Sequence, residues 1–113
     1  MSLEELRGHV HWLTSVAIRT DLRPSEAVIE LRSESARATL RLMGIVHARA
    51  DLGDPDGGLV DEVLVRELPQ YGPWPPEARH LLHHHNNRCA LQWLTITGPS
   101  EEVEILAEEF GER

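Results

Sequence analysis

The sequence predicts a single small α+β domain with elements in the order α-β-β-β-α-β-α. Three observations support this fold class. Apolar residues recur at helical spacing near both ends of the chain, several stretches between them alternate apolar and polar residues, and segments rich in Gly, Pro and Asp separate them. At 113 residues the chain suits one hydrophobic core. We therefore expect one domain over residues 1–113, with a mainly antiparallel four-stranded sheet and helices packed on it.

The first helix is expected over residues 3–18. Ser2-Leu3-Glu4-Glu5 has the pattern of a capping box, in which a hydroxyl and a carboxylate satisfy free backbone N–H groups at a helix start. Apolar residues then follow at helical spacing. Residues 10–18 are also rich in β-branched and aromatic side chains, which favour strands. In that alternative a strand follows a short helix, and the sheet has five strands.

The next segments alternate as strands do. Residues 27–32 and 38–43 form two such runs, and the polar residues 33–36 between them suit a hairpin loop. Gly44 then predicts a bulge or bend, after which residues 45–50 prolong the second strand.

Turn-forming segments divide the middle of the chain. Residues 51–58 have turn composition, and residues 59–68 are expected to form a third strand, although their apolar positions also fit a helix. Prolines in residues 69–76 remove backbone donors, which predicts an ordered loop or a partner surface.

A helix, a strand and a final helix complete the expected order. Pro76 suits a first helical turn, and the helix continues to the histidine run. Residues 89–97 are apolar on both faces and predict a central strand. In the last helix, over residues 101–110, glutamates face water and four apolar residues face inward: Val103, Leu106, Ala107 and Phe110.

Composition excludes several functional classes. The net charge of −8 and a pI near 5.3 oppose binding to nucleic acid or to anionic membranes, because phosphate binding requires clustered basic side chains. No apolar run reaches the length of a membrane span, and the acidic N-terminus does not fit a secretory signal. A single cysteine cannot form an internal disulfide. We expect a cytoplasmic protein, and the use of Arg without Lys, with few amides, favours a thermophilic bacterial source.

Residues 80–89 hold four of the seven histidines and the only cysteine. On a helix His80, His83 and His84 share one facet, and Cys89 could approach from the following strand, so these four residues are the candidate ligands of a zinc or nickel ion. The same residues also fit a simple helix terminus, where His suits the dipole and Asn suits the left-handed position. The sequence favours the helix terminus over the metal site.

Two further sets of residues are candidates for binding. Arg37 and Arg41 share strand parity and could bind a phosphate or a carboxylate. Tyr71 and Trp74 in the proline loop could form a subunit interface, where aromatic residues are enriched.

The sequence contains no motif as specific as a phosphate-binding loop or paired CxxC metal ligands, and it favours a non-catalytic role over an enzymatic one. The favoured function is a self-associating module, with a homodimer as the expected assembly. The alternatives are a transition-metal sensor or carrier that uses His80–His84, and an enzyme or anion-binding domain that uses Arg37 and Arg41.

Overall fold

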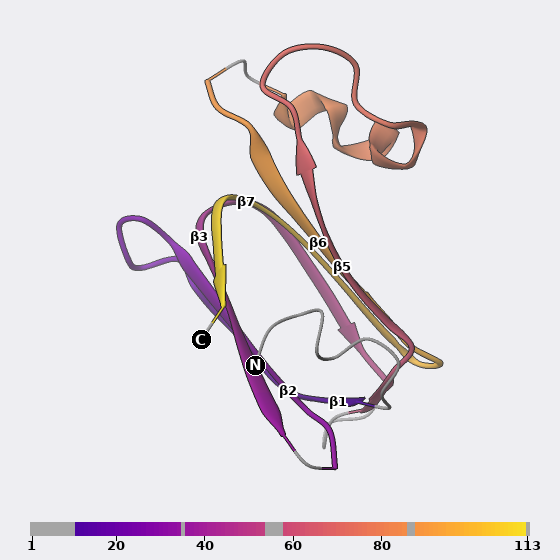
Figure 1. The fold of residues 1–113 in the computed structure, drawn as a ribbon. Coiled ribbons are helices and arrows are strands. Elements are labelled where there is room, and N and C mark those ends of the chain that lie inside the picture. The colour runs from indigo at the N-terminus through magenta and orange to yellow at the C-terminus, as the bar shows by residue number, and fades with distance from the viewer. Residues whose placement is uncertain (1–10, 35, 54–57, 86–87, 113) are drawn as a thin grey trace.

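The structure, a computed structural model, describes residues 11–34, 36–53, 58–85 and 88–112. In this part of the chain it shows seven strands and one 3-10 helix (Figure 1). The elements are β1 (His11–Arg19), β2 (Glu26–Arg32), β3 (Arg37–Leu52), β4 (Gly58–Val60), β5 (Glu62–Leu68), η1 (Pro76–His84), β6 (Leu91–Thr97) and β7 (Glu101–Glu112).

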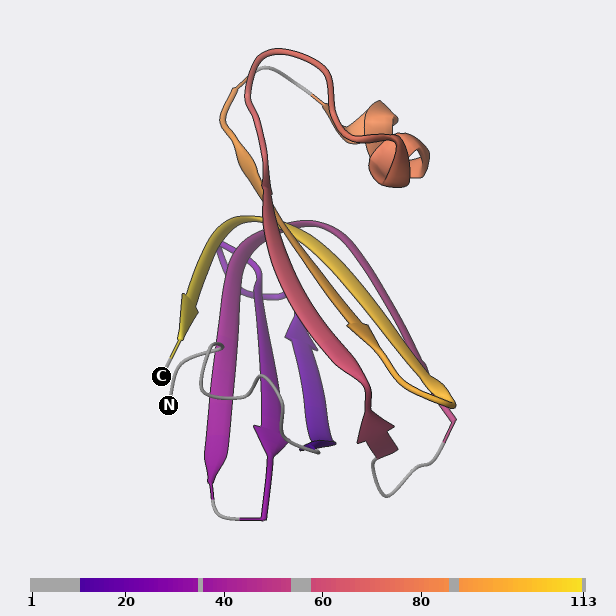
Figure 2. The ribbon, with the colours of Figure 1, turned by 45° about the vertical axis from the view of Figure 1, so that its right-hand side comes forward.

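All seven strands belong to one antiparallel sheet in the order β4-β1-β2-β3-β7-β6-β5. Only Asp61 separates β4 from β5 in the sequence, yet these two strands lie at opposite ends of the sheet order. The sheet must therefore curl until its two ends meet along one stretch of chain. Figure 2 shows this curl: β1, β2 and the first part of β3 face β5 and β6, and the long paired strands β3 and β7 bend across from one side to the other.

The predicted α+β class is wrong, because the sheet has seven strands rather than four and the two terminal helices are absent from the described residues. The largest error is at residues 101–110, which form β7 instead of the last helix. β7 pairs with β3 on one side and with β6 on the other. Backbone hydrogen bonds on both edges and burial of both faces outweigh the helical propensity of its glutamates.

The first predicted helix is also wrong over residues 11–18. Residues 11–19 form β1, which pairs with β2 and β4, so their β-branched and aromatic composition determines the outcome. The capping box at residues 2–5 lies outside the described residues.

The central predictions agree better with the structure. β2 and β3 match the two expected strands, and Gly44 has a φ of 70°, a left-handed conformation that glycine adopts without strain. A register shift in the β3–β7 pairing follows between Ile45 and His47. This bulge matters for the site, because Val46 and His47 both face the outside of the curled sheet, whereas Ile45 packs inside.

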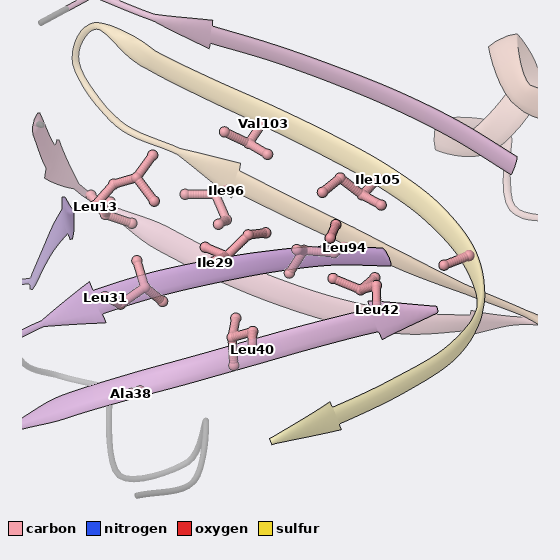
Figure 3. Close-up of a cluster of buried hydrophobic side chains, with 13 residues drawn as sticks. Leu13, Ile29, Leu31, Ala38, Leu40, Leu42, Leu94, Ile96, Val103 and Ile105 are labelled. Carbon is pink, nitrogen blue, oxygen red and sulfur yellow. The ribbon is translucent and has the colours of Figure 1, made fainter. Parts of the chain in front are cut away.

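The main core fills the inside of the curl (Figure 3). It consists of buried residues from both halves of the sheet: Leu13, Ala27, Ile29, Leu31, Ala38, Leu40, Leu42, Val60, Leu94, Ile96, Val103, Ile105 and Ala107. Burial of this apolar surface is the main force that holds the sheet closed.

A second, smaller core, which we call the outer core, lies outside the sheet, beneath the long connection between β5 and β6. Trp74, Ala78 and Leu81 from this connection pack on four buried residues of the strands and their ends: Leu68, Leu91, Trp93 and Leu106. The middle parts of β6 and β7 are thus covered on both faces, so apolar side chains there are buried on either side of the sheet.

The helix expected from Pro76 is a 3-10 helix rather than an α-helix. With three residues per turn, positions three apart lie on the same stripe. Ala78 and Leu81 form the buried stripe, which His84 continues, whereas Leu82 belongs to a stripe that is exposed. Asn86 and Asn87, predicted at the helix terminus, lie outside the described residues. No described helix has the length and hydrophobicity that a membrane span requires.

Candidate functional site

The candidate site is centred on the carboxylate of Glu104, on the outer face of β7. Alternation along β7 directs Val103 and Ile105 into the main core and Glu104 toward the outer face. Glu104 is only 6% exposed. The sequence interpretation had assigned this residue to a water-facing side of a helix, so it missed the centre of the site.

Three ring nitrogens from three different elements surround this carboxylate. Trp93 Nε1 on β6 donates to Oε2 at 3.1 Å, His80 Nε2 on η1 lies 2.8 Å from Oε2, and His47 Nε2 on β3 lies 3.2 Å from Oε1. An ionised carboxylate only accepts hydrogen bonds, so both histidines must carry a proton on Nε2 when they bind it. We call these four residues the Glu104 cluster.

The cluster keeps Glu104 ionised. Burial by itself would raise the pKa of Glu104, but hydrogen bonds from His80 and Trp93 and the charges of His80 and His47 lower that pKa below its ordinary value. The carboxylate is therefore an anchor that joins η1 to three strands. Because Nε2 of each histidine binds the carboxylate, Nδ1 is the ring nitrogen that can form a hydrogen bond with solvent or with a ligand.

His84 lies next to this cluster but does not bind the carboxylate. Its ring centroid is 3.9 Å from that of His83 and 5.4 Å from that of His47. Burial first, and then the charges of His83 and His47, lower the pKa of His84. Its Nε2 is buried and has no hydrogen-bond partner among the described residues. His84 is therefore a neutral packing residue at pH 7, in keeping with its place on the buried stripe.

The helical facet predicted from His80, His83 and His84 is divided by the 3-10 geometry. His80 and His83 share one stripe, whereas His84 belongs to the next. Within the described ranges no group of three or more His, Cys, Asp or Glu side chains is placed to hold a metal ion. Cys89 approaches Glu108, with 3.9 Å between Sγ and Oε2.

The chemistry of Cys89 is that of a protonated thiol. Burial is the main cause that raises the pKa of Cys89, and the neighbouring Glu108 carboxylate adds to it. Because the thiolate is the form that attacks electrophiles or ligates metals, a raised pKa makes the side chain less reactive.

The proline loop is fastened to η1 by two aromatic residues. Trp74 is buried in the outer core and donates from Nε1 to the Pro69 carbonyl at 2.9 Å. His85 packs edge-on against Trp74, at 4.9 Å between ring centroids, and its Nε2 lies 2.8 Å from the Gln70 carbonyl. The two residues predicted for an interface thus differ in exposure, because Trp74 is buried whereas Tyr71 is 70% exposed.

The predicted arginine pair is also divided. Arg41 forms an ion pair with Glu26 of the neighbouring strand. Arg37 lies directly opposite Arg32 in the β2–β3 register, at the other end of the hairpin. Arg32, which the sequence interpretation did not single out, therefore takes the place beside Arg37 that was expected for Arg41.

Comparisons with known proteins add no assignment to this geometry. No protein-family model matches the chain, and neither a curated protein nor a solved structure was found to be significantly similar to it.

Proposed function

We propose that this protein is a non-catalytic binding module that self-associates through the connection between β5 and β6. We call residues 69–85 of this connection the projecting segment, because Figures 1 and 2 show it standing off one end of the sheet. The observation that supports the proposal most directly is the exposure of Tyr71 and Leu82 on this segment, at 70% and 50%. They are the two most exposed large hydrophobic side chains of the described chain.

The projecting segment is packed against the sheet and therefore holds these two side chains in place. Its inner side is held by Ala78 and Leu81 in the outer core and by the contact between His80 and Glu104. An apolar residue presented on an ordered scaffold loses little conformational entropy when a partner covers it.

Charge also favours this segment over the remaining surface as a contact between two copies. The whole chain carries −8, but residues 69–85 contain one glutamate, one arginine and four histidines, so with neutral histidines their net charge is zero. Two copies that meet here avoid the repulsion that two acidic surfaces would experience.

A stable dimer buries about 800 Å² from each subunit, which is more than two side chains provide. The contact must therefore extend along the outward stripe of η1 and along the proline loop. Tyr71 and Leu82 would be its central anchors, surrounded by the polar side chains of the segment.

Sedimentation velocity of the full chain at micromolar concentration tests the proposal. The wild type should sediment as a dimer, and the double variant Tyr71→Ser, Leu82→Ser should sediment as a monomer with unchanged circular dichroism. The matched control replaces Ile18 and Leu52, which are also exposed but lie elsewhere on the sheet, by serine. This control should remain dimeric. A wild-type monomer, or equal dissociation of both double variants, would refute the proposal.

A further inference from the structure

A second surface, remote in the sequence from the projecting segment, carries two facing arginines. Arg32 on β2 and Arg37 on β3 are register partners, so their side chains emerge on the same outer face. Four other arginines of the described chain form ion pairs with carboxylates, whereas no ion pair is formed by Arg32 or Arg37 among the described residues. Two adjacent arginines without an ion pair concentrate positive charge at one place on an acidic protein.

The two arginines line a hollow in the surface. This hollow has a volume of about 330 Å³, and its lining includes Thr14, Glu30 and Thr39 together with both arginines. A second hollow, of about 410 Å³, continues around the hairpin turn and is again lined by Arg32 and Arg37. These volumes are in the range of small-molecule sites.

Arg32 is held in position by an aromatic neighbour. Its guanidinium carbon lies 5.7 Å from the centre of the Trp12 ring, within the range of a cation–π contact. The turn that sets Arg37 opposite it is closed by a hydrogen bond of 2.8 Å from the Ser33 N–H to the Ala36 carbonyl. The spacing of the two arginines is thus fixed by the backbone register and by the turn, before any ligand arrives.

Like charges on directly opposed positions of neighbouring strands destabilise a sheet, and a bound anion would remove that repulsion. Guanidinium groups match phosphate and carboxylate oxygens in paired hydrogen bonds. We infer that Arg32 and Arg37 form a binding site for the oxyanion of a small molecule, a phosphate or a carboxylate group.

Two carboxylates limit the strength of this site. Glu30 lines the first hollow and accepts a hydrogen bond from the Ser15 hydroxyl at 3.3 Å. Glu34 lines the second hollow. Both repel an anion, so removal of the Glu30 charge should strengthen binding. A purely structural role for the arginines does not predict that effect.

Titration of the 15N-labelled full chain, followed by NMR, tests this inference. Inorganic phosphate and acetate are the two probes, each at constant ionic strength with chloride as the replaced ion. At least one probe should give saturable shifts of backbone signals in the Arg32–Arg37 hairpin. Arg32→Gln and Arg37→Gln should each weaken binding about tenfold, as the loss of one charge-assisted contact implies. Glu30→Gln should tighten it.

Arg49→Gln is the matched control, because Arg49 is an exposed arginine on another part of β3 that pairs with Glu102 of β7. Its affinity for the probe should equal that of the wild type. Saturation by phosphate alone or by acetate alone identifies the class of oxyanion. The absence of saturable shifts with both probes, or equal weakening by the Arg49 variant, would overturn the inference.

Discussion

Replacement of Glu104 by leucine tests whether its buried carboxylate holds η1 to the sheet. The substitution removes the acceptor for Trp93, His80 and His47 at the same time. We expect Glu104→Leu to lower the free energy of unfolding markedly at neutral pH. Urea unfolding, followed by tryptophan fluorescence and by circular dichroism, measures this change.

The expected loss can be estimated from the exposure of the three donors. Trp93 is 3% exposed, so its indole N–H would be left without an acceptor, at a cost of about 1–3 kcal/mol. The side chains of His80 and His47 are 54% and 29% exposed, so water can replace the carboxylate there at little cost. We therefore expect a loss of about 2 kcal/mol, most of it from Trp93.

Glu101 provides the matched control on the same strand. It is 2% exposed, and neither carboxylate oxygen has a hydrogen-bond partner among the described residues. Among the described residues Glu101→Leu removes a buried carboxyl group without leaving a donor unpaired, so stability should stay the same or rise. If Glu104→Leu lost no more stability than Glu101→Leu, the proposed role of the Glu104 cluster would be refuted.

Acid titration gives this prediction a second readout. The pKa of Glu104 lies below its usual 4.5 in the folded chain, so folding is favoured by the ionised carboxylate above that pH. As the pH falls through the folded-state pKa, the contribution is lost. The difference in stability between the wild type and Glu104→Leu should therefore shrink as the pH falls below about 4.

Three further predictions concern other parts of the fold. Because the pKa of His84 is lowered in the folded chain, the unfolded chain takes up its proton first; wild-type stability should fall as the pH drops through about 6.5, and His84→Leu should reduce that slope in thermal melts. A Cβ at Gly98 would lie 2.1 Å from the Leu59 carbonyl oxygen, so Gly98→Ala should cost about 1–3 kcal/mol in urea unfolding, whereas Gly111→Ala, with open space around it, should cost far less. The raised pKa of Cys89 should make its alkylation by iodoacetamide slower than that of a free thiol at pH 7, and an equal rate would contradict its assignment as a protonated thiol.

Local sequence signals were reliable where a single face of a strand is buried. β2 alternates buried and more exposed residues, and the first half of β3 does the same, so period-two patterning predicted both strands. Gly44 was predicted as a bend because a glycine interrupts such a pattern, and its positive φ confirms the reasoning.

β7 could not be assigned by the same reasoning, because its residues satisfy both periods. Val103, Leu106 and Ala107 recur at helical spacing, whereas Val103, Ile105 and Ala107 alternate and pack in the main core. The outer core covers Leu106 on the other face, so burial is continuous and the alternation is concealed. The pairing of β7 with β3 and β6 decides its conformation, and the sequence of β7 by itself does not reveal that pairing.

The Glu104 cluster was only partly predictable for related reasons. His80 was recognised by composition, but its partner is 24 residues further along the chain, and His47 is 57 residues from Glu104. The bulge between Ile45 and His47 turns His47 to the outer face, and Gly44 predicts a bend there without revealing which face His47 takes. If residues 101–107 are interpreted as a strand, alternation places Glu104 on the face opposite to that of Val103 and Ile105. This alternation is the sequence signal that points to Glu104.

The position of Glu104 links the stability of the fold to the proposed self-association. Its carboxylate binds His80 of η1 on one side and residues of β3 and β6 on the other, so it determines how the projecting segment is held. Tyr71 and Leu82 have no comparable part in the cores, since both are exposed. Glu104→Leu should therefore weaken dimerisation and stability together, whereas the Tyr71, Leu82 double variant should weaken dimerisation alone. That difference would separate the surface proposed for the contact from the buried carboxylate that positions it.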